Sequence, residues 1–421
     1  VNTLILRNQV DSDKSVKELL NQISSDTLSA FDNQEVPFEQ IVELLDVTRD
    51  TSRNPIVQVM FSLQSFGGDA SGESALKLKD LDIFDALKDK IFIKSWQWIG
   101  SDDLVPLSNY SYPFFLLDHY IAEPMLLIRN AKDELNCFSN VCTHRGNLIA
   151  QHPGKVTKLL CAYHGRRFSQ EGKFEFMPEF KKAQDFPRAC DNLHKFQLKN
   201  LGPHLFVGMS PQFDFASVLK LLHERTDFLP LEQFKFEPAL SKDYLINAHW
   251  ALYCDNFLEG FHIPYVHKDL NETLDYGNYT TEIYDYCNLQ IGYAKNDVEV
   301  FDLPEGHIDF GKKVAAYFYW IFPNMMFNFY PWGLSVNIVK PIKTKKTKIE
   351  FISFVWDESK LKIGAGADLD KVELEDEEIV QRVQKGVGSR FYKHGRFSPR
   401  MEKGVHPVSY THLTLPTNRE V

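Results

Sequence analysis

Cys142-Thr-His144 and Cys161-Ala-Tyr-His164 decide the interpretation of this 421-residue chain. Sixteen residues separate the two motifs, and each motif supplies one thiol and one imidazole. Cys-x-His followed by Cys-x₂-His is the ligand order of a Rieske [2Fe–2S] centre, where two cysteines hold one iron and two histidines the other. A structural zinc site would use the same residue types, but it usually pairs cysteine with cysteine and histidine with histidine. The mixed pairs therefore favour the Rieske centre.

Short apolar segments and turn residues surround the two motifs. Residues 126–128 and 159–160 are predicted to be strands, and glycines near the motifs are predicted to form turns that present the ligands. This region resembles the Rieske domain of ring-hydroxylating oxygenases, through Cys-x-His-Arg-Gly at 142–146 and Cys-x-Tyr-His-Gly at 161–165. One departure stands out: Arg166 occupies the position where that family usually has tryptophan.

A second group of candidate metal ligands lies between Cys254 and His267. Asp255, Glu259 and His262 are spaced i, i+4 and i+7, so on a helix they share one face. Pro264 is expected to end that helix just after His262, which lets His267 fold back towards the same point. Two histidines and one distant carboxylate form the facial triad of non-haem Fe(II) oxygenases, which leaves coordination positions open for O₂.

The carboxylate is expected from the acidic segment 368–384, which is predicted to be a helix from its apolar residues Val372, Ile379 and Val383. In the resembling family the ligand lies nine residues before a Gln-x-Gly, here Gln384-Lys-Gly386. This spacing implies Glu375, with Asp376 as the alternative.

The same resemblance assigns roles to residues around the iron. It implies that Glu259 bridges the mononuclear site to the Rieske ligand His164 of a neighbouring subunit. Such a carboxylate would fix the imidazole tautomers and give a short hydrogen-bonded path between the metals. Asn256 and Asp255 are candidates for contacting and orienting the iron ligands, and each could equally be a helix-surface residue without that role.

The expected fold is α+β: a small all-β Rieske domain and a helix-grip catalytic domain, in which helices pack on an antiparallel sheet. The sheet is predicted from the aromatic segment 317–332 and from 348–356, joined by a basic turn at 343–348. An aromatic pocket suits either an aromatic ring or a quaternary ammonium group held by cation–π contacts. The resemblance implies a terminal oxygenase that uses Fe(II) and O₂ to hydroxylate a small organic molecule.

Electrons are expected from a separate NAD(P)H-dependent reductase, directly or through a ferredoxin. Gly364-Ala-Gly366 lacks the third glycine of a dinucleotide-binding fingerprint, so it does not indicate a reductase on this chain. The resemblance implies a homotrimer or a multiple of one. Two alternatives stay open: a Rieske electron-transfer protein without oxygenase activity, and a non-functional chimeric fragment.

The ends of the chain differ from its middle. Residues 1–83 resemble part of a nonribosomal peptide synthetase condensation domain, an α/β fold, but the His-His-x-x-x-Asp-Gly motif of that family is absent. We expect an N-terminal helix (84–92) and Rieske domain over 84–215, a C-terminally truncated catalytic domain over 216–407, and a non-native tail over 408–421. The chain is interpreted as an assembly chimera; the rival interpretation is an oxygenase linked to a synthetase.

Composition limits the partners and the compartment. Lys+Arg 47 against Asp+Glu 57 gives a net charge of −10, which argues against non-specific nucleic-acid binding and against attraction to anionic membranes. The sequence shows no basic-then-apolar leader and no apolar run long enough to span a membrane. The four cysteines outside the motifs follow no disulfide framework, so a cytoplasmic location is expected.

Overall fold

The computed structural model describes residues 15–32, 44–45, 81–295, 298–392 and 395–405. The chain divides into two compact units, residues 1–71 and 72–421. In the first unit, residues 16–32 form helix α1 (Val16–Asp32). A capping box begins this helix, because Ser15 and Glu18 each accept a hydrogen bond from the other's backbone N–H. The tail at 408–421 lies outside the described residues.

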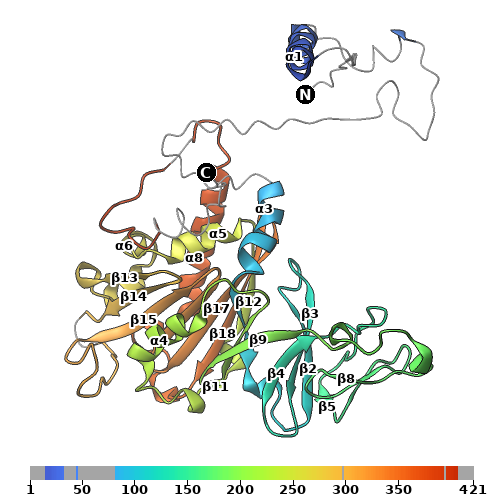
Figure 1. The fold of residues 1–421 in the computed structure, drawn as a ribbon. Helices are drawn as coiled ribbons and strands as arrows, with labels where there is room; N and C mark the ends of the chain where they lie inside the picture. Colours follow the sequence, from blue (N-terminus) through green and yellow to red (C-terminus); the bar gives the residue numbers. More distant parts are fainter. Residues whose placement is uncertain (1–14, 33–43, 46–80, 296–297, 393–394, 406–421) are drawn as a thin grey trace. The chain divides into compact units, whose positions relative to one another are not determined.

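A seven-stranded antiparallel sheet occupies the N-terminal part of the second unit (Figure 1). Its strand order is β1-β10-β9-β4-β3-β2-β5. The strands β6, β7 and β8, which lie between β5 and β9 in the sequence, form a separate three-stranded sheet. The strands are β1 Trp96–Ser101, β2 Tyr110–Leu116, β3 Glu123–Arg129, β4 Leu135–Ser139, β5 Gly154–Lys155, β6 Leu159–Leu160, β7 Arg167–Phe168, β8 Phe174–Phe176, β9 Lys195–Leu201 and β10 His204–Gly208. Both strands predicted beside the Rieske motifs are confirmed as β3 and β6.

An eight-stranded antiparallel sheet forms the second part, in the order β11-β18-β17-β16-β15-β14-β13, with β12 also paired to β18. Its strands are β11 Lys235–Phe236, β12 Lys242–Ile246, β13 Thr280–Tyr284, β14 Cys287–Tyr293, β15 Val314–Ile321, β16 Met325–Tyr330, β17 Gly333–Lys343 and β18 Lys346–Val355. The aromatic segment therefore forms β15 and β16, as predicted. The basic turn leads into the predicted strand β18, but it comes from β17, a strand that lies between the two predicted segments.

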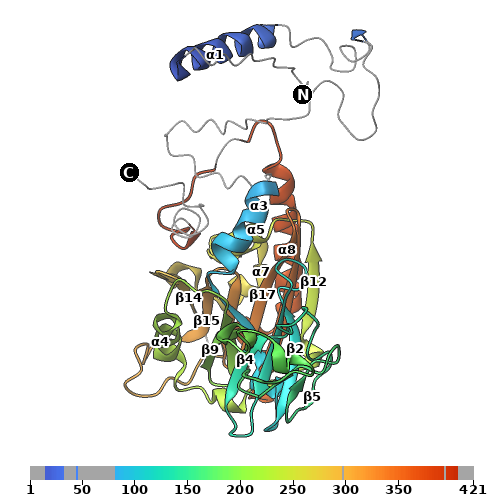
Figure 2. The ribbon, with the colours of Figure 1, turned by 45° about the vertical axis from the view of Figure 1, so that its right-hand side comes forward.

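Helices cover both faces of this sheet (Figure 2). Helix α4 packs against the face that carries Tyr319 and Phe327, and α5 and α8 pack against the face that carries Trp320 and Met326. Alternation of side chains along each strand separates these two sets. The helices are α3 Leu81–Leu87, continued by a π-helical turn Lys88–Phe92, α4 Phe215–Thr226, α5 Trp250–Phe257, α6 Ile263–Val266, α7 Lys268–Thr273 and α8 Leu369–Gly386.

Helix α8 confirms the helix predicted from the acidic segment, and Asp368 caps it by accepting a hydrogen bond from the Lys371 backbone. Of the three apolar residues that predicted this helix, Val372 and Ile379 are partly buried and Val383 is exposed, while the fully buried positions are Glu373, Val380 and Gln384. Acidic residues therefore point towards the sheet, where a metal site would need them. Among the described residues, no helix is long and apolar enough to cross a membrane.

Candidate functional site: two metal-binding constellations

The two Rieske motifs form loops of matching geometry. In the first, the Cys142 backbone N–H bonds to Asn147 O at 2.8 Å and the Gly146 N–H bonds to Cys142 O at 3.0 Å. In the second, the Cys161 N–H bonds to Arg166 O at 2.8 Å and the Gly165 N–H bonds to Cys161 O at 3.0 Å. Gly146 and Gly165 have φ of 73° and 72°, a left-handed conformation that other residues rarely adopt. The glycines thus permit the tight turns that present the ligands.

The four side chains of these loops converge. Cys142 and Cys161 are buried next to each other, and the rings of His144 and His164 lie 4.8 Å apart. Burial acts to raise the pKa of Cys161, but backbone N–H groups of Tyr163 and His164 donate to its sulfur and hold the pKa below its usual value. The Nδ1 atom of His164 is buried without a hydrogen-bond partner among the described residues. A buried imidazole nitrogen without a partner and donors aimed at a thiolate fit a bound [2Fe–2S] cluster.

The second constellation is built differently from the sequence expectation. Asp255, Glu259 and His262 do not share a helix, because α5 ends at Phe257. Pro264 does not end a helix after His262; it lies in the first turn of α6, where the missing N–H of proline costs nothing. His262 and His267 flank this single turn, with ring centroids 5.0 Å apart. The expected meeting of the two histidines is therefore seen, by another route.

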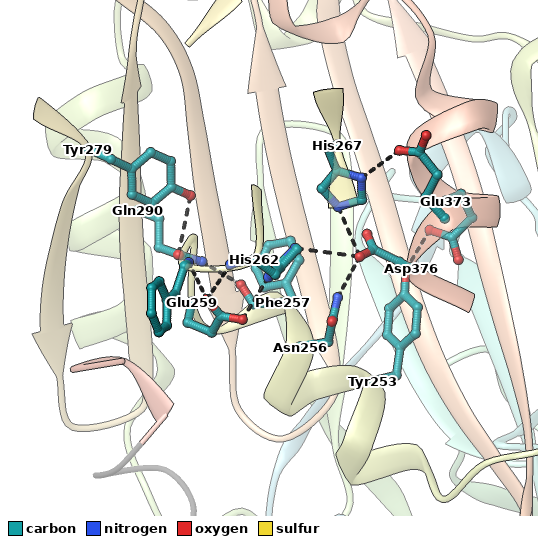
Figure 3. Close-up of polar contacts among 12 residues, drawn as sticks. Tyr253, Asn256, Phe257, Glu259, His262, His267, Tyr279, Gln290, Glu373 and Asp376 are labelled. Carbon is teal, nitrogen blue, oxygen red and sulfur yellow. Dashed lines mark hydrogen bonds and ion pairs between the residues drawn. The ribbon is translucent and has the colours of Figure 1, made fainter. Parts of the chain in front are cut away.

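Asp376 of α8 faces both histidines (Figure 3). Its Oδ1 atom lies 3.0 Å from His267 Nε2 and 3.5 Å from His262 Nε2, and the ligand atoms of these three residues all lie within 4.8 Å of one another. The facial triad consists of one carboxylate oxygen and two imidazole nitrogens on one face of the metal position, and these three residues supply that donor set. The residues present fit a mononuclear iron.

Each histidine turns its other nitrogen to a second carboxylate. His262 Nδ1 lies 2.7 Å from Glu259 Oε1, and His267 Nδ1 lies 2.8 Å from Glu375 Oε2. Carboxylates in this position fix the tautomer, so that Nε2 carries the lone pair that a metal needs. The preference for Glu375 as the third ligand is not supported, because Glu375 contacts the outer nitrogen of His267 while Asp376 reaches the inner nitrogens.

The two candidate supporting residues behave differently. Asn256 Nδ2 donates to Asp376 Oδ1 at 2.7 Å and so orients the carboxylate. Asp255 is partly buried on α5 but is not among the described residues that line the cleft beside the histidines.

One buried acid was missed from the sequence. Glu373 is 3% exposed and accepts a 2.6 Å hydrogen bond from the Tyr253 hydroxyl. Burial, together with the nearby Asp376, raises the pKa of Glu373 well above its usual value. Its position three residues before Asp376 puts both on one face of α8, a signal that the sequence already contained.

A cleft opens beside the two histidines and Asp376, between helices α5 to α8 and the sheet. Its floor is a row of side chains that register places next to one another: Phe318 pairs with Asn328, Asn328 with Ser335, and Asn337 with Phe351. Among the described residues, aromatic rings form much of its wall, and no lysine or arginine lines it. The aromatic lining residues are Tyr253, Phe257, Tyr279, Phe318, Tyr330 and Phe351.

Comparison with known families agrees with these two constellations. The Rieske [2Fe-2S] domain family matches residues 95–187, and the ring hydroxylating alpha subunit (catalytic domain) family matches residues 231–409. The chain carries both domains of a Rieske-type oxygenase. The zinc interpretation of the four-ligand motif and the electron-transfer alternative without oxygenase chemistry are both set aside by these matches. The condensation domain family matches residues 1–90, as the N-terminal resemblance predicted.

Curated relatives cover most of this Rieske oxygenase. Chloroplastic choline monooxygenase of Beta vulgaris is 26% identical over 338 residues, which span 78% of this chain and 73% of the relative. The carnitine monooxygenase oxygenase subunit of Escherichia coli (strain K12) is 24% identical and spans 75% of this chain and 83% of the relative.

Solved structures share the fold. A quaternary ammonium Rieske monooxygenase in complex with an inhibitor superimposes with a TM-score of 0.63 at 19% identity, covering 79% of this chain and 91% of that chain. Naphthalene 1,2-dioxygenase from Rhodococcus sp. superimposes with a TM-score of 0.59 at 19% identity, covering 77% of this chain and 84% of that chain. The α+β fold with an all-β Rieske domain is thereby confirmed.

Proposed function

We propose that this Rieske oxygenase hydroxylates a small quaternary ammonium compound that carries no carboxylate. Cys142, His144, Cys161 and His164 would hold the [2Fe–2S] cluster, and His262, His267 and Asp376 would hold Fe(II). When bound, these groups supply the electrons and the open coordination positions that O₂ activation requires. The observation that carries the substrate assignment is the cleft: ring faces surround it and, among the described residues, no cationic side chain lines it.

The chain's own residues prepare the iron site. Glu259 and Glu375 hold the protons on the Nδ1 atoms of the two histidines, which leaves both Nε2 lone pairs facing Asp376. Asn256 holds the Asp376 carboxylate by its Oδ1 atom. Fixed orientation of all three ligands lowers the cost of assembling the site around a metal.

Glu259 is also the proposed contact between the two metal sites. Its side chain is 13% exposed, so one edge reaches the surface while Oε1 bonds to His262. Within one chain the Rieske domain, with β2, β5 and β8, lies well away from α6 in Figure 1. We therefore propose that Glu259 meets His164 of the partner subunit, which requires a ring-like assembly such as the expected homotrimer. A relative's solved structure is described as revealing inter-subunit electron transfer.

The electrostatics of the cleft favour a cation without an acidic group. Aromatic faces attract a quaternary ammonium ion by cation–π contacts, each worth about 0.5–2 kcal/mol. Glu259 and Asp376 lie at the same cleft, where bound Fe(II) would offset their charge, and no lysine or arginine is among the described lining residues. A substrate carboxylate, as in carnitine, would therefore lose its hydration in the cleft without a cationic side chain to pair with.

The floor of the cleft supports a substrate with a hydroxyl group. Asn328 is 4% exposed, and its Oδ1 atom is buried without a hydrogen-bond partner among the described residues. A buried acceptor without a partner costs about 1–3 kcal/mol, so a ligand that donates to it is favoured. Choline, which combines a quaternary ammonium group with a hydroxyl and has no carboxylate, matches both features.

The remaining assignments rest on the same proposal. A separate NAD(P)H-dependent reductase, with or without a ferredoxin, would deliver electrons to the Rieske loops, and the cytoplasm is the proposed compartment. The histidine pair of the condensation family's catalytic motif does not occur within residues 1–421. Domain limits at 84–215 and 216–407 remain our proposed boundaries.

A single-turnover experiment tests the substrate without needing the reductase. The full chain, loaded with iron and sulfide, is reduced chemically and then mixed with ¹⁸O₂ and choline, carnitine or naphthalene. The proposal predicts ¹⁸O in a choline product and unchanged carnitine and naphthalene. Asn328→Leu is expected to weaken choline binding several-fold, and Ser359→Ala, on the surface away from the cleft, serves as its matched control. Oxidation of carnitine or naphthalene with choline left intact would contradict the assignment.

A further inference from the structure

Arg166 is a buried cation beside the Rieske ligands. It follows the second ligand motif directly after Gly165, and it is 2% exposed. Burying a guanidinium costs several kcal/mol unless partners repay it, so its surroundings need an explanation.

Three phenylalanine rings surround the guanidinium. Its central carbon lies 4.9 Å from the ring centre of Phe174, 5.5 Å from that of Phe186 and 5.7 Å from that of Phe168. Arginine stacks on aromatic faces in this way because its planar, delocalised charge is weakly hydrated. The pocket is thus built for a flat cation.

Asp191 is the counter-charge. Arg166 Nη2 donates to Asp191 Oδ1 at 2.6 Å and to its backbone oxygen at 3.2 Å. Asp191 lies in the 3₁₀ turn Ala189–Asp191, and its Oδ2 atom accepts from the Arg188 backbone at 2.7 Å. The aspartate is therefore shared with other donors, and the Nε atom of Arg166 has no partner among the described residues.

The same pair joins both ligand loops. The Asp191 backbone oxygen accepts from the Thr143 hydroxyl at 2.8 Å, and Thr143 lies between the first two ligands, Cys142 and His144. The backbone oxygen of Arg166 accepts from the N–H of Cys161 at 2.8 Å. The guanidinium is held at a fixed position relative to all four ligands by these bonds.

We propose that Arg166 raises the reduction potential of the Rieske cluster and that Asp191 limits the rise. Reduction adds one electron to the cluster and hence one negative charge, which a nearby buried cation stabilises. Because the interior screens charge weakly, the effect of a fixed guanidinium is larger here than at the surface. Arg166 is a positioning and tuning residue; it is not a ligand.

Four variants of the full, cluster-loaded chain test this inference by their midpoint potentials, followed by visible and EPR spectra during redox titration. Arg166→Met removes the charge and keeps much of the length, and we expect its potential to fall. Arg166→Lys keeps the charge, and its potential should stay closer to that of the parent protein. Asp191→Asn should raise the potential, and the double variant should return towards the parent value. Iron and sulfide analysis confirms equal cluster loading.

The outcomes separate tuning from a structural role. Equal potentials in all variants that hold a cluster would overturn the proposal, and so would an equal fall in Arg166→Met and Arg166→Lys, which would indicate lost packing. If Arg166→Met fails to hold a cluster, Asp191→Asn decides: an unchanged or lower potential rejects the proposal. None of these results depends on which substrate the enzyme oxidises.

Discussion

The Oδ1 atom of Asp376 lies 3.0 Å from Nε2 of His267, although 108 residues separate the two in the sequence. This contact joins α8 to the short turn of α6 and completes the donor set with His262. The neighbouring Glu375 reaches the other nitrogen of the same ring. The two adjacent carboxylates of α8 therefore differ in role: Asp376 faces the proposed metal position, and Glu375 orients the His267 ring.

This division predicts different outcomes for two adjacent substitutions. Asp376→Ala should remove about one iron per chain and leave the cluster, because the cluster ligands lie elsewhere. Glu375→Gln should keep that iron but bind it about 10–100-fold more weakly, as expected for a lost carboxylate–histidine contact. Iron titration of both variants, with sulfide as the internal standard, measures the difference. The reverse order of losses would make Glu375 the ligand.

A second prediction concerns the proposed path between subunits. Glu259→Gln should retain the cluster and the mononuclear iron, yet slow cluster oxidation during a single turnover by about 10-fold or more, because the bond to His262 loses its charge. Stopped-flow absorbance of the reduced cluster after mixing with O₂ and substrate gives the rate. Glu272→Gln, an exposed change on α7, is the control. An unchanged rate in Glu259→Gln would remove this residue from the path.

A third prediction concerns acid stability. His204 of β10 is fully buried among Trp98, Phe327 and Phe354, and burial lowers its pKa to about 3. Below its ordinary value of 6.5 the unfolded chain takes up a proton that the folded chain refuses. The free energy of unfolding should therefore fall by at most about 1.4 kcal/mol per pH unit between 6.5 and 3 through this residue, with the steepest fall in the middle of that range.

His204→Leu tests that slope. The leucine cannot be protonated, so the variant should lose about 1 kcal/mol less than the parent chain when the pH drops from 6.5 to 5.5. Urea unfolding at both pH values supplies the comparison. Parallel losses in the two proteins would show that His204 is protonated in the folded state.

Much of the fold followed from local patterns in the sequence. The proposed Rieske ligands are close in sequence and lie in two short loops, so their spacing and order were enough to propose them. The strands of the aromatic segment and helix α8 followed from side-chain periodicity. Long-range register, which places Asn328 next to Ser335 on the cleft floor, has no local signal and needed the structure.

The iron site was predicted less completely, for a physical reason. Pro264 is compatible both with the end of one helix and with the first turn of the next, and only the packing around α6 decides between them. Glu375 and Asp376 are adjacent, so the rotation of α8 about its axis decides which one faces His262. That rotation is set by buried residues of α8 such as Val380, and a spacing rule taken from relatives could not supply it.

The most direct test of the central claim is the metal and sulfide content of His262→Ala beside the parent chain. The parent chain should hold about three irons and two sulfides per polypeptide, and the variant about two of each. The variant should keep the Rieske visible and EPR spectra and lose substrate oxidation. An unchanged iron content, or retained turnover in His262→Ala, would contradict the assignment of a mononuclear iron to this site.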